Sequence, residues 1–194
     1  TVCNQIIKEG YFNISNNESK IIKKNYMEIL KKYDIKYPNI GPKPVSLTKN
    51  TIIKMLEQTG SNLVEGMENK IEDIYKITEK ADGERYYMYI DKESTLYLIN
   101  SNSNVIKTGI KLKSGDFAES ILDGELIIID KKYVYKYFDI YIKNNEKIFS
   151  NTLDKRIELM KKLTEEINNK SVLYIQEDKN ITCSMKEYNG IDQF

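Results

Sequence analysis

Apolar residues recur at helical spacing in two segments of the chain. In residues 18–33 the apolar positions lie on one face of a helix and lysines on the other, which predicts an amphipathic surface helix. A second apolar face of the same kind runs through residues 153–167. The apolar positions are Ile22, Tyr26, Ile29 and Tyr33 in the first segment and Leu153, Ile157, Met160, Leu163 and Ile167 in the second.

From Asp73 onward the pattern changes to short runs rich in Ile, Tyr and Val, separated by Asp, Gly, Lys and Asn. Such runs predict β-strands joined by turns. With the helices they predict an α+β fold built on mainly antiparallel sheet with flanking helices. The predicted strands cover residues 75–79, 85–90, 95–100, 125–130, 133–142 and 172–176.

All three prolines lie in residues 37–44, which cannot continue a helix and predict a linker or an extended lead-in. After it, Thr48 or Asn50 is a candidate N-cap for a short helix that ends at Gly60. We therefore divide the chain into an N-terminal lead-in with an amphipathic helix, residues 1–40, and a main domain, residues 41–194.

Composition excludes several kinds of chemistry. The 194 residues include no histidine, so no Ser-His-Asp triad, Cys-His nucleophile or imidazole zinc site can form. A formal net charge of +1 argues against nucleic-acid binding by bulk positive charge but leaves a local basic cleft open. Cys3 and Cys183 are too few for a disulfide framework and indicate a reducing compartment. No apolar run or signal peptide predicts a membrane location, so we expect a soluble cytoplasmic protein.

Charged or aromatic residues that are candidates for a functional site lie at three of the predicted strand ends. Residues 80–85, Lys-Ala-Asp-Gly-Glu-Arg, contain an Asp-Gly pair between two strand patterns, and taken alone they indicate a hairpin turn. Residues 122–127 contain a second Asp-Gly turn, after which Glu125 enters an apolar strand and needs a hydroxyl, cation or ligand as its partner. In residues 137–140, ordinary core packing is the default for Phe138.

In this order and spacing the three segments resemble the covalent nucleotidyltransferase superfamily of mRNA capping enzymes and ATP-dependent polynucleotide ligases. Residues 80–85 match its K-x-D-G-x-R motif, residues 123–125 its D-G-E motif, and residues 138–140 its aromatic-D-I motif. In that superfamily the lysine attacks the α-phosphate of a nucleoside triphosphate, expels pyrophosphate and holds the nucleotide as a phosphoramidate. The nucleotide then passes to a polynucleotide 5′ end.

Three further segments are more similar to RNA guanylyltransferases than to ligases. Residues 41–47 resemble a G-x-x-P-V-S lead-in followed by an apolar residue, residues 85–90 an R-Y-M-M pattern that ends in Ile, and residues 96–105 an apolar strand followed by I-D-R and Val. The resemblance therefore implies GTP and RNA as substrates, with Mg²⁺ or Mn²⁺ as the cation. In the third segment Asn100 and Ser101 stand where the family has Asp and Arg.

The resemblance implies a role for each matching residue. Lys80 would be the nucleophile, Arg85 a ribose or phosphate contact, Glu125 a ribose or metal ligand, and Phe138 the residue that stacks on the base. Thr78 and Glu79 would complete the base pocket beside Phe138. Lys107, or the uncharged donors Asn100 and Ser101, would supply the ribose or phosphate contact of the missing arginine; otherwise the activity would be weakened. For Asn100 and Ser101 a solvated turn is the equal alternative.

The family's later D-G-L and K-x-K motifs and its oligonucleotide-binding-fold domain have no counterpart in residues 1–194. We therefore expect the front portion of a larger capping enzyme, fused to or associated with an RNA triphosphatase and a cap guanine-N7 methyltransferase. The diphosphate end of an RNA would be the acceptor. The sequence of residues 79–85 most resembles capping enzymes of large cytoplasmic DNA viruses, which would place the protein in a viral factory or virion. The richness in Ile, Lys, Asn and Tyr is typical of an AT-rich genome, which a protist source would explain equally.

Two alternatives remain open at this point. One is an ATP-dependent polynucleotide ligase, which shares the three motifs. The other is a non-catalytic module that keeps the nucleotidyltransferase fold to bind RNA or a partner, an alternative that Ser101 and the missing later motifs favour.

Overall fold

A computed structural model of the chain describes residues 14–36, 40–41, 48–50, 76–168, 172–174 and 181–189. The chain divides into two compact units, one made of Thr1–Gly41 with Ala81–Met185 and the other of Pro42–Lys80 with Lys186–Phe194. The helices and the sheet described below belong to the first unit. Of the second unit the structure describes three short stretches, residues 48–50, 76–80 and 186–189. The last two meet in an antiparallel bridge between Ile77 and Asn189.

Both amphipathic helices that the periodicity predicts are confirmed. Helix α2 spans Asn16–Lys32, and the Ser15 side chain caps it by accepting a hydrogen bond of 3.1 Å from the Glu18 backbone N–H. Helix α5 spans Leu153–Asn168. In neither helix, among the described residues, is the apolar stretch long enough to cross a membrane.

The described strands form one curled sheet in the order β6-β5-β4-β1-β2-β3-β7, with β8 paired to β5. Every pairing is antiparallel except that of β5 with β8. The Ile181 backbone N–H, next to β8, donates to the Thr108 carbonyl of β3 at 2.9 Å, so the sheet curls towards closure. The strands are β1 Glu84–Ile90, β2 Thr95–Asn100, β3 Val105–Leu112, β4 Ser120–Ile129, β5 Lys132–Lys143, β6 Glu146–Lys147, β7 Val172–Tyr174 and β8 Thr182–Met185.

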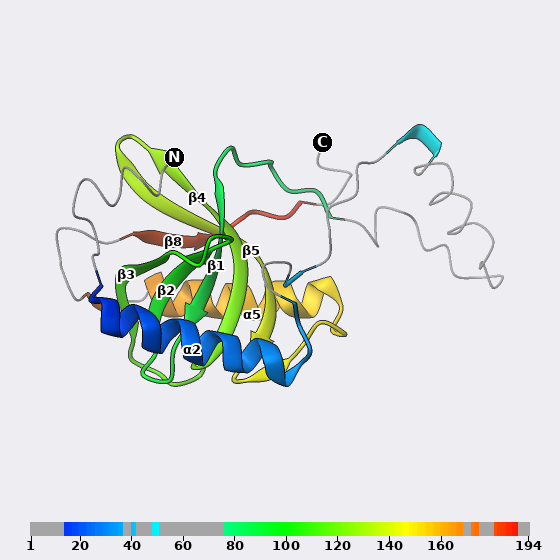
Figure 1. The fold of residues 1–194 in the computed structure, drawn as a ribbon. Helices are drawn as coiled ribbons and strands as arrows, with labels where there is room; N and C mark the ends of the chain where they lie inside the picture. Colours follow the sequence, from blue (N-terminus) through cyan, green and yellow to red (C-terminus); the bar gives the residue numbers. More distant parts are fainter. Residues whose placement is uncertain are drawn as a thin grey trace. The chain divides into compact units, whose positions relative to one another are not determined.

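The central strands are buried on both faces because a helix covers each side (Figure 1). In Figure 1 α2 lies in front of the sheet and α5 behind it. The apolar face of α2 packs on alternate residues of β1 and β2, among them Tyr87, Tyr89, Tyr97 and Ile99. On α5, Thr164 meets the Tyr137 hydroxyl of β5 at 2.6 Å. The predicted α+β class with antiparallel sheet and flanking helices is confirmed.

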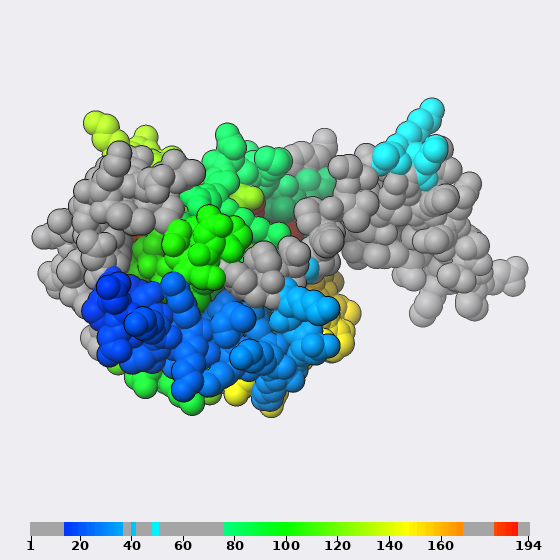
Figure 2. Space-filling model, in the orientation of Figure 1, coloured from blue at the N-terminus to red at the C-terminus, as the bar shows by residue number. Residues whose placement is uncertain are grey.

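Helix α2 is also held at both ends by polar contacts with the sheet. Near its start, Glu18 accepts hydrogen bonds from Lys107 and the Tyr97 hydroxyl at 2.8 and 3.0 Å. At its end, the Lys32 ammonium and the Tyr33 hydroxyl donate to the Asn145 carbonyl at 2.8 and 2.5 Å. The outer surface of the helix stays exposed and forms the blue ridge at the bottom of Figure 2.

The predicted hairpin around residues 80–85 is wrong. Strand β1 has β2 on one side and β4 on the other, so both of its edges are occupied. In the predicted strand 75–79, Ile77 forms a single bridge with Asn189, and Tyr75 lies outside the described residues. The local Asp82-Gly83 signal therefore marks the approach to β1 and not a tight turn between two paired strands.

The second predicted Asp-Gly turn is also wrong, because Asp123 and Gly124 lie inside β4. A Cβ on Gly124 would lie 2.6 Å from the Lys136 carbonyl oxygen and 2.6 Å from the Tyr135 ring, so glycine is required here for close approach of β5. The true β4–β5 turn is at Asp130 and Lys131, both with positive φ. Beside it Ile128 and Ile129 are exposed, so the run after Glu125 is not a buried strand throughout.

Part of the proline-rich lead-in belongs to the core of the first unit. Ile40 is 3% exposed and packs in the cluster beneath α2, and Gly41 lies against the ring of Tyr141. The rest of residues 37–47, Cys3, and most of the predicted helix that ends at Gly60 lie outside the described residues, although Lys49 and Asn50 are helical. Cys183 is a buried free thiol. The domain boundary at residue 40 stays a prediction.

Candidate functional site

Arg85, the last residue of the lysine motif, lies on β1 and binds Asp123 of the D-G-E motif on β4. The Arg85 Nε donates to Asp123 Oδ1 at 2.9 Å, and its second terminal nitrogen donates to Oδ2, so the pair is bidentate. The Asp123 side chain is 0% exposed and that of Arg85 is 40% exposed. Two motifs that lie 38 residues apart in the sequence therefore meet on neighbouring strands.

The electrostatics of this pair are those of a buried carboxylate held by a cation. Burial raises the pKa of Asp123, and the hydrogen bonds and charge of Arg85 offset that effect only in part. The same hydrogen bond, opposed by partial burial, raises the pKa of Arg85 further above its usual range. The Arg85 guanidinium also lies over the Tyr87 ring, 5.3 Å from its centroid. Arg85 is therefore permanently charged, and one edge of its guanidinium is bound by the Asp123 carboxylate of the neighbouring strand.

A third group completes the Asp123 environment. The Tyr141 hydroxyl, from β5, donates to Asp123 Oδ2 at 2.9 Å. The Tyr141 ring is buried, and it packs edge-on against Phe149 at a centroid distance of 4.9 Å. The buried carboxylate thus has hydrogen-bond donors on both of its oxygens, as a buried charge requires.

The third motif repeats this arrangement with the chain's other arginine. Asp139 of the aromatic-D-I motif accepts hydrogen bonds from Arg156 of α5, at 2.7 Å from Nε and 3.3 Å from a terminal nitrogen. The Ile140 backbone N–H donates to the same carboxylate at 2.8 Å. Both side chains of the ion pair are mostly buried, at 16% and 12% exposure. This contact fixes α5 to the strand that carries Phe138.

Glu125 and Phe138 lie on the adjacent strands β4 and β5 and are both half-buried. Glu125 is the cross-strand partner of Arg85 on one side and of Lys136 on the other. Phe138 falls where the β4–β5 register shifts, between the pairs Gly124–Tyr137 and Asp123–Asp139. Such an extra residue in one strand re-aims a side chain relative to its neighbours.

Asn100, Ser101 and Lys107, the predicted substitutes for the missing arginine, have different environments. Asn100 is 2% exposed, and its Oδ1 accepts the backbone N–H groups of Asn102 and Asn104 at 3.0 and 2.9 Å, which closes the β2–β3 turn. Ser101 lies exposed in that turn. Lys107 forms its 2.8 Å ion pair with Glu18. Asn100 therefore belongs to a turn, as the alternative interpretation predicts, but it is buried and only Ser101 is solvated. A ligand role for the three residues stays a prediction.

The predicted nucleophile and its neighbours belong to the second unit. Lys80 and Glu79 are exposed and Thr78 is half-buried. The Thr78 Oγ1 atom is buried and has no hydrogen-bond partner within the part of the chain that the structure describes. Buried hydroxyl groups in proteins are usually hydrogen-bonded. A nucleotide contact for Thr78 stays a prediction.

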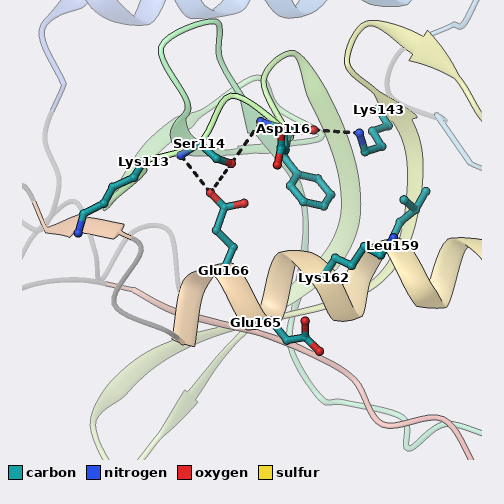
Figure 3. A pocket seen from close by; sticks show the side chains of 9 residues that line it. Lys113, Ser114, Asp116, Lys143, Leu159, Lys162, Glu165 and Glu166 are labelled. Atoms are coloured by element: carbon teal, nitrogen blue, oxygen red, sulfur yellow. Dashed lines mark hydrogen bonds between the residues drawn. The ribbon is translucent and has the colours of Figure 1, made fainter.

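A separate pocket of about 790 Å³ lies between the β3–β4 loop and α5 (Figure 3). Two hydrogen bonds link residues of its lining: Glu166 accepts from the Ser114 hydroxyl at 2.7 Å, and Lys143 donates to the Asp116 carbonyl at 2.9 Å. Lysines and acidic residues balance along its walls, and none of the predicted site residues lines it. The motif residues of the first unit lie instead along β1, β4 and β5.

Sequence reasoning missed Tyr141 and Arg156 as members of this arrangement, and it gave Asp123 and Asp139 no role of their own. Two signals were available. The chain contains only two arginines, and both aspartates interrupt strongly apolar strands, where a carboxylate needs a cationic partner. No comparable signal distinguishes Tyr141 among 15 tyrosines.

Comparison with known proteins decides which family this arrangement belongs to. Residues 10–194 match the family described as mRNA capping enzyme, catalytic domain. The chain belongs to this family. The capping-enzyme assignment made from the motifs is thereby confirmed over the ligase alternative.

One relative of this capping-enzyme chain is the "Probable mRNA-capping enzyme" of Acanthamoeba polyphaga mimivirus. The two are 34% identical over 92 residues, which is 46% of this chain and 8% of the relative. The chain thus spans a small part of the length of that relative. The similarity to a protein of a large DNA virus agrees with the viral relationship that the sequence indicates.

Proposed function

We propose that the chain carries the nucleophile and part of the nucleotide site of an mRNA guanylyltransferase with the nucleotidyltransferase fold. The observation that carries the proposal is the convergence of motifs on one stretch of sheet. Arg85 of the lysine motif binds Asp123 of the D-G-E motif, and Asp123 is the direct cross-strand partner of Asp139 in the third motif. Family membership supplies the reaction class.

In the first step the Lys80 Nζ lone pair attacks the α-phosphorus of GTP. A P–N bond forms, the bond from that phosphorus to the bridging oxygen breaks, and pyrophosphate leaves with the electron pair. The lysine must lose a proton to solvent or to the leaving group before or during the attack, because an ammonium is not a nucleophile. The product is a lysyl-GMP phosphoramidate.

In the second step a terminal oxygen of the RNA 5′-diphosphate attacks the same phosphorus. The P–N bond breaks, Lys80 regains a proton, and GMP is joined to the RNA through a triphosphate bridge. In both steps negative charge builds on the non-bridging oxygens. We assign Arg85 to that charge or to the ribose, because Asp123 uses two of the five N–H donors of its guanidinium and fixes its orientation.

A divalent cation, Mg²⁺ or Mn²⁺, would shield the charge of the triphosphate. Mg²⁺ in nucleotide-dependent enzymes is commonly held by substrate phosphate oxygens with one or two carboxylates. We assign Glu125 to this cation, because the resemblance gives this role to the glutamate of the D-G-E motif and Glu125 lies half-buried on β4, opposite Arg85 of β1. Ribose binding is the alternative role for Glu125.

Base recognition is assigned to Phe138, Thr78 and Glu79. Phe138 would stack on guanine, and the buried Thr78 hydroxyl would gain a partner from the nucleotide. RNA is the proposed acceptor, and association with an RNA triphosphatase and a cap methyltransferase remains an expectation from the resemblance.

The proposal is tested by incubating the protein, in its full natural length, with α-labelled GTP or ATP and Mg²⁺ or Mn²⁺. We expect a labelled protein band from GTP that survives denaturation, is removed by added pyrophosphate, and transfers its label to diphosphate-ended RNA. Labelling by ATP alone would favour a ligase. RNA binding with no labelling by either nucleotide would favour a non-catalytic module.

A further inference from the structure

Tyr141 lies outside every motif, yet it contacts the carboxylate that orients Arg85. It follows Asp139 by two residues on β5 and is 3% exposed. Its hydroxyl donates to Asp123 Oδ2, the oxygen that also accepts from the terminal nitrogen of Arg85. The tyrosine and the arginine therefore share one oxygen of a side chain that is 0% exposed.

The position of the tyrosine is itself fixed by two residues. Phe149 meets its ring edge-on, with an interplanar angle of 81°. Gly41 also lies so close that an added Cβ would overlap the Tyr141 hydroxyl and lie 2.7 Å from Cε2. Gly41 is the first residue of the segment 41–47, which resembles the G-x-x-P-V-S pattern of guanylyltransferases. A side chain at position 41 would displace the hydroxyl from Asp123.

We propose that Tyr141 is a positioning residue for Arg85, acting through Asp123, and that Gly41 is required to leave room for it. Gly41 packs against Tyr141, Tyr141 donates a hydrogen bond to Asp123, and Asp123 binds Arg85 of the proposed nucleotide site. Rotation of the Asp123 carboxylate moves both acceptors of the bidentate pair, and the Tyr141 hydrogen bond restrains that rotation. The catalytic consequence rests on the proposed function of Arg85 as a nucleotide contact.

The chain offers a matched control in the same strand. Tyr137 is also buried, and its hydroxyl bonds to Thr164 of α5 at 2.6 Å, away from Arg85. Tyr141→Phe and Tyr137→Phe each remove one buried hydroxyl and keep the ring. A general loss of packing or stability would affect both variants alike, and thermal melting of each measures that loss.

The first readout is independent of activity. Residues 1–194 contain only two arginines, so ¹⁵N-arginine labelling of this 194-residue chain gives two side-chain Nε–H signals, those of Arg85 and Arg156. Tyr141→Phe is expected to shift or broaden the Arg85 signal and to leave that of Arg156, bound to Asp139, unchanged. Gly41→Ala should give the same change, and Tyr137→Phe should leave the Arg85 signal in place. An Arg85 signal that is the same in Tyr141→Phe as in wild type would overturn the proposal.

The second readout is the rate of adduct formation with GTP. Loss of a hydrogen bond to a buried charge should lower the maximal rate constant roughly ten-fold in Tyr141→Phe, with KM changed less, and leave Tyr137→Phe near wild type. Equal rates in the two variants would refute the positioning role. If wild type forms no adduct, the proposed function fails, and the arginine spectrum still decides whether Tyr141 orients Arg85.

Discussion

Asp123 on β4 and Asp139 on β5 are direct cross-strand partners, and each binds one of the two arginines in the chain. Two carboxylates opposite each other repel and destabilise a sheet unless each has a cationic partner. Arg85 of β1 neutralises the charge of Asp123, and Arg156 of α5 neutralises that of Asp139. One ion pair joins the first motif to the second, and the other joins the third motif to α5.

The Arg156–Asp139 pair is expected to be a large contribution to stability. Arg156→Met leaves Asp139 mostly buried and without its cation, and should lower the free energy of unfolding by about 2–4 kcal/mol. Urea unfolding measures it. The double variant Arg156→Met/Asp139→Asn should lose about 1–2 kcal/mol less than the sum of the single changes. Strict additivity would show that the pair carries no coupling.

Gly124 is expected to be required for packing, whatever its place in the motif. Gly124→Ala puts a Cβ against the Lys136 carbonyl and the Tyr135 ring, and should cost about 1–3 kcal/mol in unfolding free energy. Gly115→Ala is the control, because nothing lies within 4 Å of its added Cβ. If both variants unfold at the wild-type urea concentration, the close approach of β5 to β4 is not as described.

Asp91 gives the protein a pH dependence of known sign. Burial, with the charge of Glu93 in the same direction, raises the pKa of Asp91 to about 6 against the hydrogen bond that it accepts from the Thr95 N–H. The folded chain thus holds the proton more tightly than the unfolded one, and ionisation costs stability as pH rises from about 4 through 6. Asp91→Asn keeps an acceptor for Thr95 and should be about 1–2 kcal/mol more stable than wild type at pH 8, and equal at pH 4. A less stable variant at pH 8 would contradict the raised pKa.

Glu18 is expected to give a pH dependence of stability with the opposite sign. Partial burial would raise its pKa, but hydrogen bonds from Lys107 and Tyr97 outweigh this and lower it. Its contribution is therefore full above the unfolded value near 4.5 and is lost as pH falls through the lower folded value. Glu18→Gln should cost about 0.5–1 kcal/mol at pH 7 and nothing at pH 3. Glu28→Gln on the same helix, whose pair with Lys24 is exposed at 3.9 Å, should have no measurable effect at either pH.

Local pattern was enough to predict the elements that bury a regular apolar face. Strand β2 has the predicted bounds, and α5 begins at the predicted Leu153, because each depends on residues close in sequence. Strand β3 was not predicted because polar residues interrupt it. Two of them are satisfied by distant groups, since Lys107 bonds to Glu18 and the Thr108 hydroxyl donates to the Leu96 carbonyl.

For the candidate site too, only the local features could be predicted from the sequence. Its motifs could be identified from residue order, but their contacts could not. Arg85 finds its partner 38 residues later, and Gly41 meets Tyr141 across the core. The two Asp-Gly pairs were interpreted as turns because the local signal is the same whether glycine serves a turn or a close approach.

The central claim is that one lysine, Lys80, carries the nucleotide. Its most direct test is peptide mass spectrometry of the full-length protein after reaction with GTP and a divalent cation, with Lys80→Ala and Lys76→Ala run in parallel. The account predicts a single guanylylated peptide, modified at Lys80, that is lost in Lys80→Ala and retained in Lys76→Ala. A guanylyl group on another residue, or one that persists in Lys80→Ala, would contradict it.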